Sequence, residues 1–508
     1  MNITFYYWIA FITYSIIVIG IGYYIWNKRR KQKIQDDSDS YWSASKNLSG
    51  WSSGLSISAS MMSISWSCVY GVQLFYWYGI SAAWLLIIPW LLTMAGFFLL
   101  VPLFRKLQVF SQPELLANKF GLKIRSIISI PLIFVFIVWG GAEIYAAGIT
   151  IAPFLNISIP LTMFLLSLVI AIYTYIGGFQ AVVSTDKIQF VLVALFILIL
   201  AIVGYTSATS SGNNFNIIDI SSTSPKHINK SIFLAPGIAL IIFTFITYLP
   251  GWLVETDIWL RLQASRSNRE ARKGILVAFI NSFLFVGVLP MIIGLSALVL
   301  YPSSGGEIPV KLQEGALIFQ NLMADYTPIW LNVLLGIGLI AAAMSTVDTC
   351  GNVVALSLSY DIVEPLVKNK ISPHKSKLIA SYISVLAIFL AFVYALFTDS
   401  LWDIFYLSSG ILTTTIFVPV ISVFLPNTKR REVILCIIFG FFGTLIFYFL
   451  ESRGLLMGIE PDFIASTQLG YILYGFILCL IGFGIGKASK SIKPKKFIGN
   501  EFFTEGRS

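Results

Sequence analysis

Apolar segments of about 20 residues recur along almost the whole chain, and they restrict the possible folds more than any other feature. A helix of this length crosses a bilayer, because each residue adds about 1.5 Å and the hydrocarbon core is about 30 Å thick. The composition agrees, since 57% of the residues are hydrophobic, 11% are charged and the mean hydropathy is +0.83. The sequence therefore predicts an all-α membrane protein with about 13 transmembrane helices, at 5–26, 54–77, 81–103, 126–153, 158–179, 185–206, 233–258, 275–300, 327–358, 378–397, 402–425, 433–450 and 467–486.

Two of these spans, 54–77 and 233–258, have the composition of broken helices. The first is rich in serine and glycine, and the second contains Pro250 and Gly251 in the middle of an apolar run. Proline removes a backbone donor and glycine relaxes the helix, so backbone carbonyls become free inside the membrane. The broken spans are the first members of two consecutive sets of five helices. This position is typical of a five-plus-five inverted-repeat transporter whose site lies at the unwound segments.

The apolar segments leave no stretch for a separate folded domain, so we expect a single polytopic membrane domain over residues 1–508. All four cysteines lie in apolar segments, and a disulfide framework is not expected. Within the domain we assign a peripheral first helix (5–26), a first five-helix repeat (54–206), a second five-helix repeat (233–425), two peripheral helices (433–486) and a cytoplasmic tail (487–508).

The basic residues predict the orientation. All but four of the 34 Lys and Arg follow odd-numbered spans, and the exceptions are Lys226, Lys230, Lys311 and Arg453. Because cytoplasmic loops carry the excess of positive charge, we expect a plasma-membrane protein with its N-terminus outside and its C-terminus in the cytoplasm. The first span precedes KRRKQK and is interpreted as an uncleaved signal anchor. The net charge of +10 then reflects topology, and no nucleic-acid partner is expected.

A polar stripe marks the span 327–358. Ala342, Ser345, Thr346 and Thr349 are spaced i, i+3, i+4 and i+7, so one carbonyl and three hydroxyls share a helix face that suits a hard cation. The alternative is that these small residues allow close helix packing, with the hydroxyls bonded to the preceding turn. That alternative leaves Asp348 unexplained, because an acid inside a span is rare and usually functional.

The stretch YTYIGGFQAVVSTDKIQF at 173–190 resembles the signature of the sodium/solute symporter family. AAAMSTVDT at 341–349 is similar to the ion-binding helix of that family, and WLRLQASRSNREARKG at 259–274 is similar to its cytoplasmic loop. The resemblance extends from about Tyr41 to Pro426. It implies the five-plus-five inverted-repeat fold, alternating access and sodium-coupled uptake.

The resemblance also implies two groups of ion ligands. The first sodium site is formed by the carbonyls of Ala59, Met62 and Ala342 with the hydroxyls of Ser345 and Thr346. A second sodium site, present in some relatives, involves Asp186, Ser345, Asp348 and Thr349.

Asp348 departs from the family pattern, because it stands where relatives with a second sodium site often have a hydroxyl. It could bind sodium or hold a proton. We favour sodium, since Ser345 and Thr349 would complete an oxygen shell. Asp186 also has an alternative role, since Ser184, Thr185 and Asp186 could cap the cytoplasmic end of the sixth span.

Solute-binding positions implied by the resemblance are Ser63, Trp66, Tyr248, Trp252 and Glu255. The last three are spaced i, i+4, i+7 and share a helix face. An aromatic face with one carboxylate suits a small solute with an apolar body or a positive nitrogen. The alternative is an aromatic belt at the membrane interface.

The acids inside the predicted spans have no Lys or Arg beside them deep in the membrane, so cations are expected to accompany them. Only Glu255 and Asp257 are expected near enough to Arg261 to meet it. Glu143 has no partner that the sequence identifies, and we add it to the solute-binding candidates. An unpaired carboxylate favours an amine-bearing or zwitterionic solute.

The function predicted from these observations is sodium-coupled symport of a small organic solute, with sodium as the coupling ion and the bilayer as the other partner. The alternatives are a sodium- and proton-coupled symporter of an amine or zwitterion, or a channel or sensor of the same fold. An enzyme is not expected, because both histidines, His227 and His374, lie in loops and the spans lack a nucleophile with its base.

Overall fold

The computed structural model describes residues 3–31, 47–107, 109, 111–210, 215–227, 231–366 and 373–488; the side chains of 25, 28–31, 177–181 and 373–377 are outside this description. The described part is helical throughout, with isolated β-bridges and no β-strand. Twelve of its helices are long and apolar enough to cross a membrane, and one bent pair raises the number to 13. The predicted class and number of spans are therefore confirmed.

The chain forms a peripheral helix and then two successive groups of helices. The peripheral helix is α1 (Ile3–Lys31). The first group consists of α3 (Gly50–Met61), the π-helix η2 (Ile64–Tyr70), α4 (Gly71–Tyr78), η3 (Gly79–Trp84), α5 (Ile87–Lys106), α6 (Gln112–Phe120), α7 (Leu122–Leu155) and α8 (Ile159–Ser210). The short elements α9 (Ile217–Ser222) and η4 (Ile232–Leu234) lead to the second group.

The second group begins with α10 (Ile238–Trp252) and α11 (Thr256–Ala264). It continues with α12 (Asn268–Ser282), η5 (Phe283–Val288), α13 (Leu289–Leu300), η6 (Val310–Leu312), α14 (Ile318–Tyr326), α15 (Ile329–Ala355), η7 (Leu356–Val363), α16 (Glu364–Leu366), α17 (Pro373–Ala395), α18 (Leu401–Ile411), η8 (Leu412–Phe417) and α19 (Val418–Ser422). The described part closes with α20 (Arg430–Ser452), α21 (Asp462–Ala465) and α22 (Gly470–Ala488).

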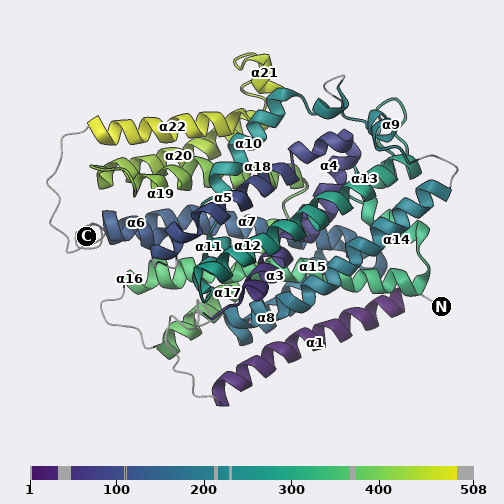
Figure 1. Ribbon diagram of the computed structural model, residues 1–508, viewed down its shortest axis with the longest axis horizontal. Coiled ribbons are helices and arrows are strands. Elements are labelled where there is room, and N and C mark those ends of the chain that lie inside the picture. The colour runs from purple at the N-terminus through teal and green to yellow at the C-terminus, as the bar shows by residue number, and fades with distance from the viewer. Residues whose placement is uncertain are drawn as a thin grey trace.

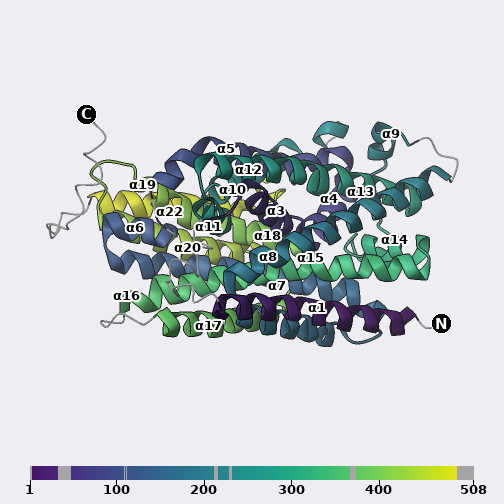
Figure 2. The same ribbon diagram turned by 60° about the horizontal axis from the view of Figure 1, so that its bottom comes forward.

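The long helices run in roughly one direction, with α1 on one side of the bundle and α20 and α22 on the other (Figure 1). Helix α1 packs against α8 and α15, and α20 packs along α22. Figure 2 shows the same bundle turned about its long direction, with α3, α15 and α18 near its middle. The helices expected to be peripheral therefore flank a core that contains the broken spans.

Helix α8 differs from the expectation. Its backbone is helical over 52 residues, Ile159–Ser210, and includes both predicted spans 158–179 and 185–206. A straight helix of that size would be about 78 Å long, far more than the roughly 30 Å of the hydrocarbon core. The predicted connection between the two spans is therefore helical rather than an irregular loop, and the family-like residues 177–181 lie in it with side chains outside the described part.

The first broken span is divided between α3 and η2. The axis of Gly50–Met61 differs by 54° from that of the segment Ile64–Trp84, which begins with η2. Helix α3 ends at Met61, and the Ser63 hydroxyl accepts the Trp66 N–H at 2.9 Å to begin η2. A serine with extended backbone before a new helix is a favoured N-cap, so this break follows from the local sequence.

The second break lies a few residues after the expected one at Pro250 and Gly251. Both residues are in the last turn of α10, and the helix is interrupted after Trp252, from Leu253 to Glu255. Thr413 of η8 explains the distortion, because its hydroxyl accepts the Gly251 N–H at 2.9 Å and donates to the Thr247 carbonyl at 2.6 Å. A side chain inserted between a donor and its i−4 acceptor is a known cause of helix distortion.

Helix α1 begins at one end of the bundle and α22 ends at the other (Figure 1), as an odd number of crossings requires. We expect Ser211→Cys, which lies outside the described residues, to react with an impermeant thiol reagent in intact cells. Thr428→Cys, between α19 and α20, should react only after permeabilisation. Background should be low because all four native cysteines are buried. The reverse pattern of labelling would contradict the predicted orientation.

Candidate functional site

The carbonyl end of α3 meets the hydroxyl stripe of α15. The Ser345 hydroxyl donates to the Ala59 carbonyl at 3.2 Å and to the Ala342 carbonyl at 3.0 Å. Because a helix leaves its last four carbonyls without intrahelical partners, the end of α3 provides acceptors at this point. Met62 is the C-cap residue of the same helix and is buried. The predicted ligands Ala59, Ala342 and Ser345 are thus brought together, and Met62 lies at the same end of α3.

Thr346 also reaches α3, but through an atom that the sequence did not identify. Its hydroxyl donates to the Ser60 carbonyl at 3.1 Å. Ser60 follows Ala59 directly, so the contact belongs to the same helix end. A cation here would require the hydroxyls of Ser345 and Thr346 to rotate and present their lone pairs, which each hydroxyl has in addition to its donor.

Asp186 lies in a second polar cluster, where its partner is a buried arginine that the sequence analysis did not assign to it. The Ser56 hydroxyl donates to Asp186 Oδ2 at 2.5 Å, and Arg261 Nη2 lies 3.5 Å from the same oxygen. Both charged side chains are fully buried. The expectation that deep acids have no basic partner is therefore wrong for Asp186. The expected contact between Asp257 and Arg261 is present.

Arg261 was assigned to a cytoplasmic loop together with 262–273. The structure instead places it in α11, all of whose residues are buried, within the candidate span Ile232–Ala264. Its guanidinium also donates to the hydroxyls of Ser56 at 2.8 Å, Ser60 at 3.0 Å and Thr349 at 3.3 Å. A buried arginine is tolerated because these acceptors and two carboxylates surround it.

Asp348 has a different partner from the other candidate ligands. The Tyr173 hydroxyl of α8 donates to Asp348 Oδ2 at 2.6 Å. Its other oxygen, Oδ1, is buried and has no hydrogen-bond partner among the described residues. The structure therefore brings Asp186 and Thr349 together through Arg261, whereas Asp348 faces Tyr173.

Glu143 of α7 contacts the first break. Its carboxylate accepts the Ser65 N–H at 3.2 Å and the Ser65 hydroxyl through a short contact. Ser65 lies in the first turn of η2, where backbone N–H groups lack intrahelical partners and favour an acid. Glu143 therefore has the partner that the sequence did not identify, and it fixes the second half of the broken helix to α7.

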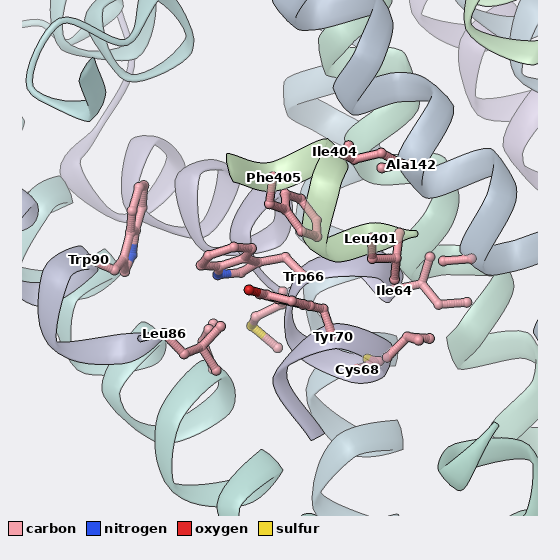
Figure 3. Close-up of a cluster of buried hydrophobic side chains, with 14 of the residues drawn as sticks. Ile64, Trp66, Cys68, Tyr70, Leu86, Trp90, Ala142, Leu401, Ile404 and Phe405 are labelled. Carbon is pink, nitrogen blue, oxygen red and sulfur yellow. The ribbon is translucent and has the colours of Figure 1, made fainter. Parts of the chain in front are cut away.

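The aromatic solute-binding candidates form one buried cluster. The rings of Tyr248 and Trp252 stack with centroids 4.2 Å apart, and Trp66 meets Tyr248 at 5.8 Å and Trp252 at 5.5 Å, edge to face. Figure 3 shows Trp66 beside Tyr70 and Phe405, with Trp90 to one side. All three candidates are buried inside the protein, so they do not form an exposed belt.

Sequence reasoning missed Tyr70 and Phe405, which extend this cluster, and it missed Ser56, Ser60 and Arg261. Phe405 lies 4.8 Å from Trp66 between ring centroids. Tyr70 follows Trp66 by four residues and Ser56 precedes Ser60 by four, so the i, i+4 spacing used for the other candidates could have identified them. No local signal separates Arg261 from the arginines that follow it.

Two kinds of polar atoms remain open beside the aromatic cluster. The hydroxyls of Tyr70 and Tyr248 are buried close to each other and to the Tyr406 hydroxyl, and neither makes a hydrogen bond of ordinary geometry among the described residues. The Glu255 carboxylate at the second break is 2% exposed and makes no hydrogen bond within the described part of the chain. Its charge interacts with that of Arg261, as expected, although the two side chains form no direct ion pair. Ser63 uses its hydroxyl to cap η2. The open atoms supply two donors and one negative charge.

Two interrupted spans, with carbonyls at one break and aromatic rings between them, are the architecture of a secondary transporter. Comparison with known proteins supports the same class of transporter. Residues 41–440 match the model of the sodium:solute symporter family, so the chain belongs to this family and is a sodium-coupled solute symporter.

Curated relatives are similar over most of their length. The sodium/sialic acid symporter NanT of Aliivibrio fischeri is 23% identical over 385 residues, covering 73% of this chain and 72% of the relative. The sodium/glucose cotransporter of Vibrio parahaemolyticus is 26% identical over 421 residues, covering 75% and 73%.

A solved structure of a Na⁺-coupled sialic acid symporter in a substrate-bound, outward-open state has the same fold. Its TM-score is 0.69 at 18% identity, covering 96% of this chain and 98% of the other. The confirmed predictions are the family, the fold class and sodium-coupled transport.

Proposed function

We propose that the protein takes up a small solute bearing a positive nitrogen, with sodium bound between α3 and α15 and the solute bound at the aromatic cluster. The observation that carries the sodium site is the meeting of the Ser345 hydroxyl with the carbonyls of Ala59 and Ala342. Carbonyls freed by an unwound span, together with hydroxyls, are the oxygen ligands that sodium takes in transporters of this construction. Met62 and Thr346 complete the proposed shell.

The solute class follows from the second set of contacts. Trp66, Tyr248 and Trp252 offer ring faces, which attract a cationic nitrogen by cation–π interaction. Glu255 supplies a buried carboxylate that makes no hydrogen bond among the described residues. The open hydroxyls of Tyr70 and Tyr248 can donate to an acidic group of the same solute. An amino acid or a betaine combines these features, so a zwitterion is the solute class that the geometry favours.

The test is a ligand screen on purified protein, with thermal stability measured in sodium and in an equal concentration of potassium. Amino acids, betaines and amines should stabilise the protein only in sodium. The names of the relatives suggest sialic acid and glucose as comparison solutes. Stabilisation by glucose alone would reject the proposed solute class, and equal stabilisation in potassium would reject the proposed coupling. Uptake of the best compound into proteoliposomes then separates a carrier, which concentrates its solute, from a channel.

Asp348 provides a separate prediction about stoichiometry. Because its carboxylate faces Tyr173 rather than the carbonyls of α3, we expect Asp348→Ser to change the sodium concentration for half-maximal uptake by less than about threefold. The sodium Hill coefficient should stay as in the unmodified protein. A lower Hill coefficient would show that Asp348 binds sodium, and loss of a pH dependence present in the unmodified protein would show that it carries a proton.

A further inference from the structure

Oxygen atoms from three other helices surround the guanidinium of Arg261. Its Nη2 atom lies 3.0 Å from the Ser60 hydroxyl of α3, 3.3 Å from the Thr349 hydroxyl of α15 and 3.5 Å from Asp186 of α8. Two hydroxyls and a carboxylate around one positive group form the type of shell that also suits a sodium ion. Two members of this shell, Asp186 and Thr349, are candidate ligands of a second sodium.

The charges in this cluster do not balance. Arg261 contacts two carboxylates, those of Asp186 and Asp257, and all three side chains are at most 3% exposed. The nearby charges include two further acids, Asp348 and Glu255, which act on Arg261, and one further base, Lys187, which acts on Asp186. One carboxylate oxygen of each acid, Asp186 Oδ1 and Asp257 Oδ2, is buried without a hydrogen-bond partner among the described residues. A buried, unpaired negative charge is costly, so the cluster favours one additional cation.

The guanidinium of Arg261 has a second buried partner, Asp257, which it can keep when it moves away from the other three oxygen atoms. Asp257 precedes it by four residues on α11, so the two side chains share a helix face and are already paired. If a cation took Ser60, Thr349 and Asp186, the guanidinium could keep its pair with Asp257.

We propose that Arg261 is a tethered cation that competes with a second sodium ion for the shell formed by Ser60, Thr349 and Asp186. The guanidinium fills the shell in the present structure, and sodium fills it when Arg261 withdraws toward Asp257. This proposal depends on the proposed sodium coupling. It links the two broken spans, because Ser60 belongs to the first and Arg261 to the second.

The test is to titrate purified protein with sodium at constant ionic strength and to measure its thermal unfolding temperature at each sodium concentration. Arg261→Gln removes the competitor, so the sodium concentration for half-maximal stabilisation should fall about tenfold. The gain should disappear in the double variant Arg261→Gln with Asp186→Asn. The control Arg266→Gln removes an exposed guanidinium that pairs with Glu270 on α12, and its titration should match that of the unmodified protein.

A second variant keeps the proposal testable if Arg261→Gln does not fold. Asp257→Asn weakens the alternative position of the guanidinium, so Arg261 should hold the shell more firmly and sodium should bind about tenfold more weakly. A purely structural arginine would not move the two variants in opposite directions. The proposal fails if Arg261→Gln leaves sodium binding unchanged or weaker, or if Asp257→Asn strengthens it. If the unmodified protein does not respond to sodium at all, the proposed coupling itself is wrong.

Discussion

Replacing Ser345 by alanine should raise the sodium concentration for half-maximal uptake by about tenfold to a hundredfold. The Ser345 hydroxyl lies within hydrogen-bond distance of the Ala59 and Ala342 carbonyls, and its loss removes a proposed ligand and the donor to the Ala59 carbonyl at the end of α3. Such a loss costs about 1–3 kcal/mol, and about 1.4 kcal/mol corresponds to a factor of ten in affinity. Uptake at saturating sodium should recover in part.

The matched control is Ser384→Ala. Ser384 is also buried in a long helix, but its hydroxyl donates to the Ala380 carbonyl of its own helix at 3.1 Å. Its removal should leave the sodium dependence of uptake unchanged. Equal sodium curves for both variants would show that the meeting of α3 and α15 does not bind the coupling ion.

Replacing Asp361 by leucine should lower the free energy of unfolding by about 3–5 kcal/mol. Asp361 of η7 accepts from Arg125 Nε of α7 at 2.9 Å and from the Ser111 hydroxyl at 2.8 Å. The guanidinium also lies 4.2 Å from the centroid of the Tyr360 ring. Without Asp361 the charge of Arg125 stays buried and unpaired, which is the costly step.

Thermal unfolding of purified protein measures this effect, and two further variants test its cause. Removing both charges, Arg125→Met with Asp361→Leu, should restore most of the lost stability, because a buried pair can be replaced by apolar side chains at little cost. Glu314→Gln removes one side of the exposed pair with Lys226 and should cost less than about 1 kcal/mol. A double variant as unstable as Asp361→Leu would show that the unpaired charge is not the cause.

The sequence by itself determined the features that depend on short stretches of chain. Helix length and apolar composition predicted the spans, because a helix of about 20 apolar residues is long enough to cross the bilayer and satisfies its own backbone hydrogen bonds. The serine-rich stretch around Ser63 predicted the first break, because Ser63 caps a new helix. The pair Pro250 and Gly251 predicted the second break only approximately, since both residues remain in α10 and the interruption follows from Leu253 to Glu255. The spacing of Ser345 and Thr346 predicted one polar face, because helical periodicity is also a local property.

Only the tertiary structure decided which groups meet across helices. Arg261 is 75 residues from Asp186 and 205 from Ser56, yet it contacts both. Its burial cannot be deduced from its neighbours, since Arg266, in the same family-like stretch, lies exposed. Glu143 has its partner 78 residues away in Ser65, and Asp348 faces Tyr173 across 175 residues. A buried charge takes its position from the partners that packing brings to it, and those partners are set by how the helices pack and not by the periodicity of any one of them.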